Sequence, residues 1–319
     1  MAHQSFVSIV GVLQSQHNVR ELASWLQNLY AELQAQFTDF EFVIVNNCCD
    51  AHSIDAVISP LEESIRKNVF LLNLSTPVNR DNAILAGLDR ANGDYTVIFE
   101  FDFSEKAQLV TQLWENSQVG YDIVYLRAKE RLLPLHQRFL YYIFYFILRK
   151  YSQLQIDPWS HQSRIISRRA LNSLLRLREN SQYLKANYAL VGYKTSYIPV
   201  DESLHTDPGT TFGEQFRTAL VALTSFTTFL RSLLLWIFLF SVLVAGVATL
   251  NAVKVKFTHV DILGEQVESL SGWAFLVVLI SVFFAITCLN LYVMSIYLSN
   301  IYREIKNRPL YILESVKRF

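Results

Sequence analysis

The sequence predicts an α/β protein with a mostly parallel sheet, helices on both faces and a membrane anchor near its C-terminal end. Three observations lead to this prediction. The first 130 residues alternate strand-like and helix-like patterns, two long charge-free runs lie near the C-terminus, and an aromatic-rich stretch separates the two regions. Strands that alternate with helices are typical of a parallel sheet covered on both faces.

Runs of β-forming apolar residues and stretches with helical spacing alternate along the first part of the chain. The predicted strands are 6–13, 40–46, 69–74, 95–99 and 121–128. Between them, apolar residues at helical spacing predict helices near 17–36, 54–61 and 79–91. Two later stretches, 164–175 and 193–200, predict further α/β elements that complete the domain.

Two charge-free runs predict membrane-spanning helices. They lie between Arg231 and Lys254 and between Glu268 and Arg303, and each exceeds the roughly 20 apolar residues that cross a bilayer core. A buried helix pair in a soluble protein is the alternative. Basic residues follow the second run, whereas acids enrich the loop 254–268. The positive-inside rule therefore predicts an integral membrane protein whose soluble domain and both termini are cytoplasmic.

Residues 134–152 break the alternation of strands and helices. Ten uncharged and mostly aromatic residues lie between Arg138 and Arg149, too few to span a bilayer. They suit a helix that lies in the membrane interface, with a core helix of the α/β domain as the alternative. Residues 213–231 predict a second interfacial helix. We therefore divide the chain into a domain over 1–212, this second helix, and a two-helix membrane domain with a short tail over 232–319.

Composition limits the possible partners and the compartment. The net charge is zero, so no nucleic-acid partner is implied. The three cysteines, Cys48, Cys49 and Cys288, form no metal-binding pattern and indicate a reducing compartment for the N-terminal part. Residues 1–30 lack a basic segment followed by an apolar core, so no signal peptide is expected.

The stretch from Tyr95 to Glu105 carries the most informative acids. A buried strand is followed by Glu100, Asp102 and Glu105, and ligands of open α/β sheets bind at the carboxyl ends of the strands. Because side chains alternate along an extended segment, Glu100 and Asp102 are expected on one face. Two such carboxylates would hold a divalent cation against a diphosphate. The alternative is a strand end with solvated acids.

This order of elements resembles the polyprenyl-phosphate glycosyltransferases, family 2 enzymes with a GT-A fold that include bacterial polyprenyl-phosphate glucosyltransferases and dolichol-phosphate mannose synthases. The resemblance covers essentially the whole chain. Its best local matches are LLNLS (71–75), AILAGLDRANGDYTVIFEFD (83–102), GYDIVYLRA (120–128), VGYKTSYIPV (191–200) and YREIKNRPLYILE (302–314). The resemblance implies transfer of a hexose from a nucleotide sugar to a membrane polyprenyl phosphate with a divalent cation, Mg²⁺ or Mn²⁺. It also implies a homo-oligomer packed through the membrane spans or the interfacial helices.

The chemical motifs of this family are altered here. Its Asp-x-Asp motif reads Glu100-Phe101-Asp102, and the acid that contacts the nucleotide base is replaced within Asn47-Cys48-Cys49. The carboxylate expected to act as base on the acceptor falls within His161-Gln162-Ser163-Arg164, where Gln162 cannot take a proton. The basic pair that holds the acceptor phosphate is missing around Gly209, where His205 is the nearest candidate cation.

The resemblance assigns roles to the residues that match its motifs. Asp102, Arg164 and His161 are the catalytic candidates, and His161 is a candidate base because its ordinary pKa is near neutrality. Glu100 and Asp102 are the candidate metal ligands. The candidate substrate-binding residues are Asn47, Arg80, Arg131 and Glu105.

Three functions remain open at this point. The first is an active glycosyltransferase with an altered site. The second is a catalytically silent relative that acts as a binding, scaffolding or regulatory subunit of a membrane complex. The third, a lipid or sugar translocation subunit, would need oligomerisation because two spans form no pathway. An intact cleft around Glu100 and Asp102 would favour the enzyme, and a cleft filled by Phe101, Phe103 or Lys106 would favour the silent relative.

Overall fold

The protein is built around one mixed sheet of eight strands. The structure, a computed structural model, describes residues 3–47, 49–130, 135–152, 154–177, 183–204, 213, 219–220, 222–224, 226–260, 264, 272–306 and 308–319. The strand order is β7-β5-β6-β4-β1-β2-β3-β8. The strands are β1 (His3–Leu13), β2 (Phe37–Asn46), β3 (Val69–Leu74), β4 (Tyr95–Ile98), β5 (Ile123–Ala128), β6 (Ser160–Ser167), β7 (Thr195–Val200) and β8 (Leu313–Arg318).

Parallel pairing dominates the centre of the sheet, as the alternating pattern predicts. Strand β1 pairs in parallel with both β2 and β4, and β2 pairs in parallel with β3. Strand β6 is antiparallel to β4 and β5, and β8 is antiparallel to β3. The prediction of an α/β fold with a mostly parallel sheet is confirmed.

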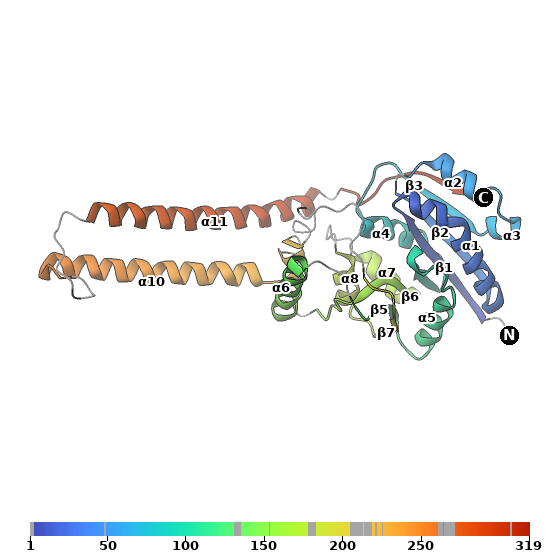
Figure 1. Cartoon of the computed structure of the whole chain (residues 1–319), viewed down its shortest axis with the longest axis horizontal. Helices are drawn as coiled ribbons and strands as arrows, with labels where there is room; N and C mark the ends of the chain where they lie inside the picture. The colour runs from blue at the N-terminus through green and yellow to red at the C-terminus, as the bar shows by residue number, and fades with distance from the viewer. Residues whose placement is uncertain are drawn as a thin grey trace.

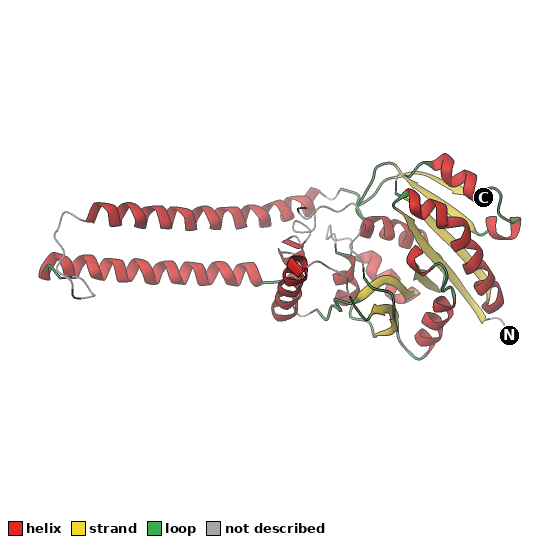
Figure 2. Ribbon diagram, in the orientation of Figure 1, coloured by secondary structure: helices red, strands yellow, loops and turns green. Residues whose placement is uncertain are grey.

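Helices cover both faces of the sheet (Figure 2). One face packs against α1 (Gln16–Gln36), α2 (Ala51–Ile58), α3 (Glu63–Arg66) and α5 (Gln108–Gln118). The other face packs against α4 (Arg80–Arg90), α7 (Arg168–Arg176) and α8 (Leu184–Leu190). Neighbouring strand residues divide between the faces: Ile9 lies in the first core and Val10 in the second. Strands with both faces covered read as continuous apolar runs, as these do.

The direction of the connections reverses between β1 and β4. From β1 the chain proceeds through β2 to β3 on one side, and β4 then pairs with the opposite side of β1. A crevice outside the carboxyl ends of the strands forms at such a reversal, and it is the usual ligand position in an open α/β sheet. The residues after Leu13 and after Ile98 border this position.

The last residues of the chain return to the sheet. We expected a short tail after the second apolar run, but Leu313–Arg318 form β8 along the edge of β3, with Leu72 opposite Val316. The Tyr311 hydroxyl donates to Asp89 Oδ2 at 2.7 Å, and Asn73 Nδ2 donates to Ser315 Oγ at 3.0 Å. The tail is therefore a structural part of the α/β domain, and both termini lie at its end of the molecule (Figure 1).

Two long helices extend side by side away from the sheet (Figure 1). They are α10 (Phe229–Thr258) and α11 (Gly272–Lys306). Within them, Ser232–Val255 and Val282–Ser299 are long and apolar enough to cross a bilayer. Almost none of the described residues in these two apolar segments is buried inside the protein. Large apolar side chains such as Trp236 and Phe240 are instead exposed.

Helix α6 (Leu135–Tyr151) lies crosswise at the base of these two helices (Figure 1). Leu148 is buried in a cluster with Leu230 of α10 and Val293 of α11. The opposite side is exposed, because Phe139, Tyr142 and Phe146 keep 64%, 70% and 52% of their surface accessible. Helix α6 thus contributes to the cluster at the base of α10 and α11, whereas the cores on the two faces of the sheet are built from other elements. Most of the second predicted interfacial helix, 213–231, lies outside the described residues.

Candidate functional site

The acids after β4 do not share one strand face, so that prediction is wrong. Strand β4 ends at Ile98, and Phe101–Phe103 form a 3₁₀ turn. Three aromatic rings cause this, because Phe99, Phe101 and Phe103 are all buried in the core beneath α1. The turn separates the two acids: the Glu100 side chain is only 9% exposed, whereas Asp102 lies exposed to solvent.

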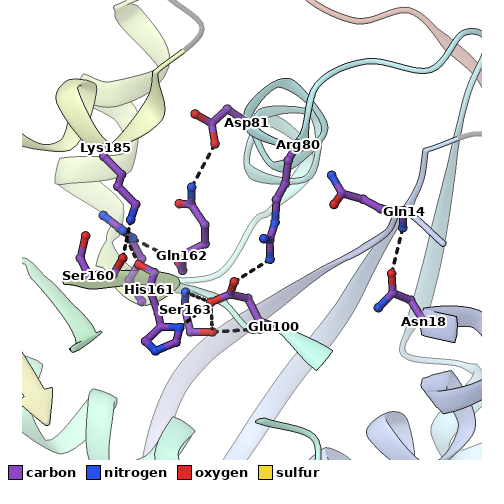
Figure 3. A network of polar contacts seen from close by, with 11 residues as sticks. Gln14, Asn18, Arg80, Asp81, Glu100, Ser160, His161, Gln162, Ser163 and Lys185 are labelled. Carbon is purple, nitrogen blue, oxygen red and sulfur yellow. Dashed lines mark hydrogen bonds and ion pairs between the residues drawn. The ribbon is translucent and has the colours of Figure 1, made fainter. Parts of the chain in front are cut away.

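Glu100 is the centre of a polar network at the reversal between β1 and β4 (Figure 3). Its Oε1 accepts from Arg80 Nη2 at 2.5 Å. Its Oε2 accepts from the Ser163 backbone N–H at 2.9 Å and from the Ser163 hydroxyl at 3.0 Å. The Ser163 Oγ in turn accepts from the Glu100 backbone N–H at 3.0 Å. Helix α4, the end of β4 and strand β6 are thereby joined through one carboxylate.

These contacts keep Glu100 ionised. Burial raises the pKa of the Glu100 carboxyl, but Arg80, His161 and the two Ser163 donors outweigh it and hold the pKa at about 2. The positive charge and the hydrogen bonds both favour the charged form. At neutral pH the site therefore contains a carboxylate paired with a guanidinium.

His161 lies beside this carboxylate and is almost completely buried. Its Nδ1 is 3.8 Å from Glu100 Oε2, and its Nε2 is 3.3 Å from the backbone oxygen of Glu202. Burial lowers the pKa of His161 below its ordinary value, and the attraction of Glu100 only partly offsets this. The imidazole is thus neutral at physiological pH. Its edge packs against Phe103 with ring centroids 5.0 Å apart, which fixes its orientation.

Gln162 binds an acid that the sequence analysis did not single out. Its Nε2 donates to Asp81 Oδ1 at 3.0 Å, and the Leu184 backbone N–H donates to Asp81 Oδ2 at 2.8 Å. Lys185 Nζ donates to the backbone oxygen of Ser160. The sequence analysis missed Asp81, which follows Arg80 in the first turn of α4. An acid in a first helical turn is common enough that only the fold shows its partner.

Arg164 is buried and holds the backbone of this segment. Its guanidinium donates to the backbone oxygens of His161 at 2.7 Å and Gln162 at 3.2 Å. It also lies over the Tyr188 ring, 3.9 Å from the centroid. These contacts position His161 and Gln162 and keep the guanidinium away from solvent.

Asn47 also has its side chain engaged by the backbone. Its amide donates to the oxygen of Val78 at 2.8 Å and accepts from the N–H of Val78 at 2.9 Å. This pair of hydrogen bonds fixes the loop before α4, and Asn79 then caps that helix by accepting from the Asn82 N–H. Asn47 therefore helps to place Arg80 beside Glu100.

The remaining predicted residues are less constrained. Asp102 and Glu105 are exposed, and Asp102 lies close enough to His161 to act on it electrostatically. Lys106 pairs with Glu202 at the surface, and burial of Phe101 and Phe103 directs them into the core. Arg131 and the segment around Gly209 lie outside the described residues.

The residues present do not fit a divalent cation in the predicted way. Within the described part of the chain, no group of three or more His, Cys, Asp or Glu residues could hold a metal ion. Glu100 Oε2 already accepts two hydrogen bonds and Oε1 carries the guanidinium of Arg80. A carboxylate oxygen offers about two acceptor positions, so the carboxylate has little capacity left for a metal.

The sequence is similar to glycosyltransferases over most of its length. No protein-family model matches it. It is 25% identical over 296 residues to an uncharacterized glycosyltransferase of Synechocystis, with 91% of each chain covered. It is 26% identical over 252 residues to the bactoprenol glucosyl transferase of Shigella phage SfII, covering 77% of this chain and 79% of that protein. The chain is a distant family 2 relative of the bactoprenol glucosyltransferases. The predicted resemblance is confirmed.

The chain is also similar to chains of solved structures. A mannosyltransferase of Pyrobaculum calidifontis in complex with GDP-Man and Mn²⁺ has a TM-score of 0.45 and 14% identity, covering 72% of this chain and 65% of that one. A mannosyl-3-phosphoglycerate synthase of Rubrobacter xylanophilus has a TM-score of 0.45 and 9% identity, covering 69% of this chain and 72% of that one.

Proposed function

We propose that this protein is a membrane-bound glycosyltransferase with a GT-A-like domain, which moves a hexose from a nucleotide sugar to polyprenyl phosphate. Several of the relatives are named bactoprenol glucosyl transferases, which supports this substrate class. The observation that carries the proposal is the position of the polar network. It lies at the strand reversal where an open α/β sheet binds its ligand, and it is connected to the base of the two apolar helices.

The connection to the membrane base runs through α8 and α6. Asp81, beside Arg80, accepts from the backbone of Leu184. The neighbouring Tyr183 has its hydroxyl 3.0 Å from that of Tyr145 in α6. Tyr145 and Tyr183 both pack against the cluster that contains Leu148 and Val293. A phosphate on a lipid anchored beside α6 would therefore arrive near the network around Glu100.

The proposed reaction needs little acid–base chemistry. An oxygen of the acceptor phosphate would attack C1 of the hexose, while the bond from C1 to the diphosphate breaks and the nucleoside diphosphate leaves. Since a phosphate monoester is largely ionised at neutral pH, the Gln162 amide in place of a carboxylate is compatible with this step. Positioning and neutralisation of charge then provide the rate enhancement.

The membrane topology follows from the same proposal. Helices α10 and α11 would cross the bilayer, α6 would lie at its interface, and the α/β domain would be cytoplasmic. The basic residues after α11, among them Arg308, Lys317 and Arg318, support this orientation. The exposed aromatic side of α6 supports the interfacial position.

A catalytically silent relative is the second candidate, and one observation favours it. The Glu100 carboxylate is fully engaged by Arg80 and Ser163, and Gln162 is bound to Asp81, so the polar groups of the site satisfy one another. Such a protein would bind a partner or a lipid and regulate or scaffold a membrane complex.

A transfer assay separates the two candidates. The full chain in nanodiscs that contain polyprenyl phosphate would be incubated with radiolabelled UDP- or GDP-hexoses, and label in the organic-extractable fraction would be measured. We expect label from one nucleotide sugar to enter that fraction and to disappear without the acceptor lipid. No transfer and no calorimetric binding of any nucleotide sugar, in protein whose circular dichroism shows it to be folded, would support the silent relative instead.

A further inference from the structure

We infer that the Arg80–Glu100 ion pair takes the role that a divalent cation would otherwise have in binding the diphosphate. The site would therefore bind its sugar nucleotide without Mg²⁺ or Mn²⁺. This inference rests on the proposed function and specifies its donor site. It departs from the cation that the family resemblance implies, and it follows from the geometry around Glu100.

The first step concerns the capacity of the carboxylate. Ser163 donates twice to Oε2, through its backbone N–H and its hydroxyl, and Arg80 lies 2.5 Å from Oε1. A metal on Oε2 would have to displace a hydrogen bond that also fixes β6 to β4. A metal on Oε1 would lie beside the guanidinium, and like charges at such short range repel strongly in a partly buried site.

The second step concerns the other predicted ligand. Asp102 is turned into solvent by the 3₁₀ turn that buries Phe101 and Phe103. The Glu100 carboxylate is instead enclosed by Arg80 and Ser163. The neighbouring acids therefore do not form a pair that could share one ion.

The third step concerns charge. The charges of two carboxylates and a divalent cation sum to zero, and so do the charges of one carboxylate and one guanidinium. Arg80 is the first residue of α4, its guanidinium reaches Glu100 after β4, and 27% of its side chain is exposed. A guanidinium presents five N–H donors in a plane that matches phosphate oxygens, and the helix end adds positive potential. Arg80 can thus contact a diphosphate from its exposed side while Glu100 holds it in place.

Calorimetric binding to the full chain in detergent tests the inference. The probes are UDP, GDP, UDP-glucose and GDP-mannose, each titrated in EDTA and in millimolar Mg²⁺ or Mn²⁺. We expect one nucleotide to bind with dissociation constants that agree within about twofold across these buffers. Arg80→Gln should weaken binding about ten- to a hundredfold, as for loss of a charged hydrogen bond, and Arg80→Lys should restore part of it.

Arg90→Gln is the matched control. Arg90 is in the last turn of the same helix, is 30% exposed and is 3.9 Å from Glu41, away from the crevice. We expect this variant to bind like the wild type. Wild-type binding in EDTA needs no variant, so the test stands even if an Arg80 variant is poorly folded.

Three results would overturn the inference, and they differ in whether they also overturn the proposed function. Binding that occurs only with Mg²⁺ or Mn²⁺ would overturn it while leaving the proposed glycosyltransferase intact. Cation-free binding that is unchanged in folded Arg80→Gln would show that the ion pair only stabilises the fold. Absence of binding by every nucleotide in every buffer would overturn the proposed function together with the inference.

Discussion

Replacing Glu100 with Gln removes one negative charge from the centre of the polar network and changes little else. Gln has nearly the same shape as a protonated Glu, so the variant approximates the protein with Glu100 neutralised. The wild-type carboxylate accepts from Arg80 and twice from Ser163. The variant removes the negative charge that faces Arg80, and we expect it to be less stable at neutral pH.

The magnitude follows from the pKa of Glu100. The ordinary value is 4.5, and the folded protein holds it at about 2. One unit of pKa corresponds to about 1.4 kcal/mol, so ionisation of Glu100 contributes roughly 3 kcal/mol to the free energy of unfolding at pH 7. This is a large fraction of the stability of an ordinary domain.

The contribution has a defined pH dependence. A carboxyl group whose pKa is lower in the folded protein stabilises it above the unfolded pKa, and the stabilisation is lost as the pH falls through the folded pKa. For Glu100 the loss begins near pH 4.5 and is complete below about pH 2. The difference between wild type and Glu100→Gln should therefore shrink to roughly 1 kcal/mol at pH 3.

Urea unfolding in detergent, followed by tryptophan fluorescence, measures both quantities. Trp25 is a suitable probe because it is fully buried and packs against Phe101, with ring centroids 5.1 Å apart. Glu105→Gln is the control, since Glu105 is exposed and its replacement should change stability by less than about 0.5 kcal/mol. A loss below about 1 kcal/mol for Glu100→Gln at pH 7, or an equal loss at pH 3, would refute the assigned pairing.

Three further changes test other parts of the structure. Gly87→Ala should cost about 1–3 kcal/mol in the same urea assay, because its Cβ would lie 2.4 Å from Val10 Cγ1; no loss would contradict the packing of α4 on the sheet. Deletion of 313–319 should speed hydrogen exchange of the amides of 69–74 at least about tenfold, because β3 would become an edge strand; unchanged protection would argue against β8. Gln162→Glu should place a second carboxylate beside Asp81 and raise the pKa of one of them, so the variant should be destabilised at pH 7 and recover as the pH falls toward 5; equal stability at both values would contradict the contact.

The strands and most helices of the α/β domain could be predicted because their signals are local. Apolar runs predicted β1, β2 and β3, which are strands with both faces buried. The predicted range 69–74 coincides with β3. The long amphipathic stretch near 17–36 became α1, whose buried residues include Leu22, Trp25 and Leu29. In each case the apolar pattern of consecutive residues predicts which positions are buried.

The exceptions depend on partners that are distant in sequence. Strand β8 has no buried residue, and its partner β3 lies about 240 residues earlier, so nothing in LESVKR alone indicates a strand. The predicted positions of the acids after β4 rest on the alternation of side chains along an extended chain. Burial of Phe101 and Phe103 ended that alternation, and Glu100 turned to Arg80 and Ser163. Tertiary packing overrode the local pattern at the position where the site is formed.

The return of β8 to the sheet constrains the path of the whole chain. The start of α10 lies beside the second half of α11, since Leu230 of α10 and Val293 of α11 share one buried cluster with Leu148 of α6. Because β8 must pair with β3 after α11, the segments before α10 and after α11 lie on the same side of any bilayer that the two helices cross. The positive-inside argument, which uses only charge, reaches the same arrangement independently. Both routes keep the network around Glu100 on the side where α6 lies, as the proposed transfer to a lipid-borne phosphate requires.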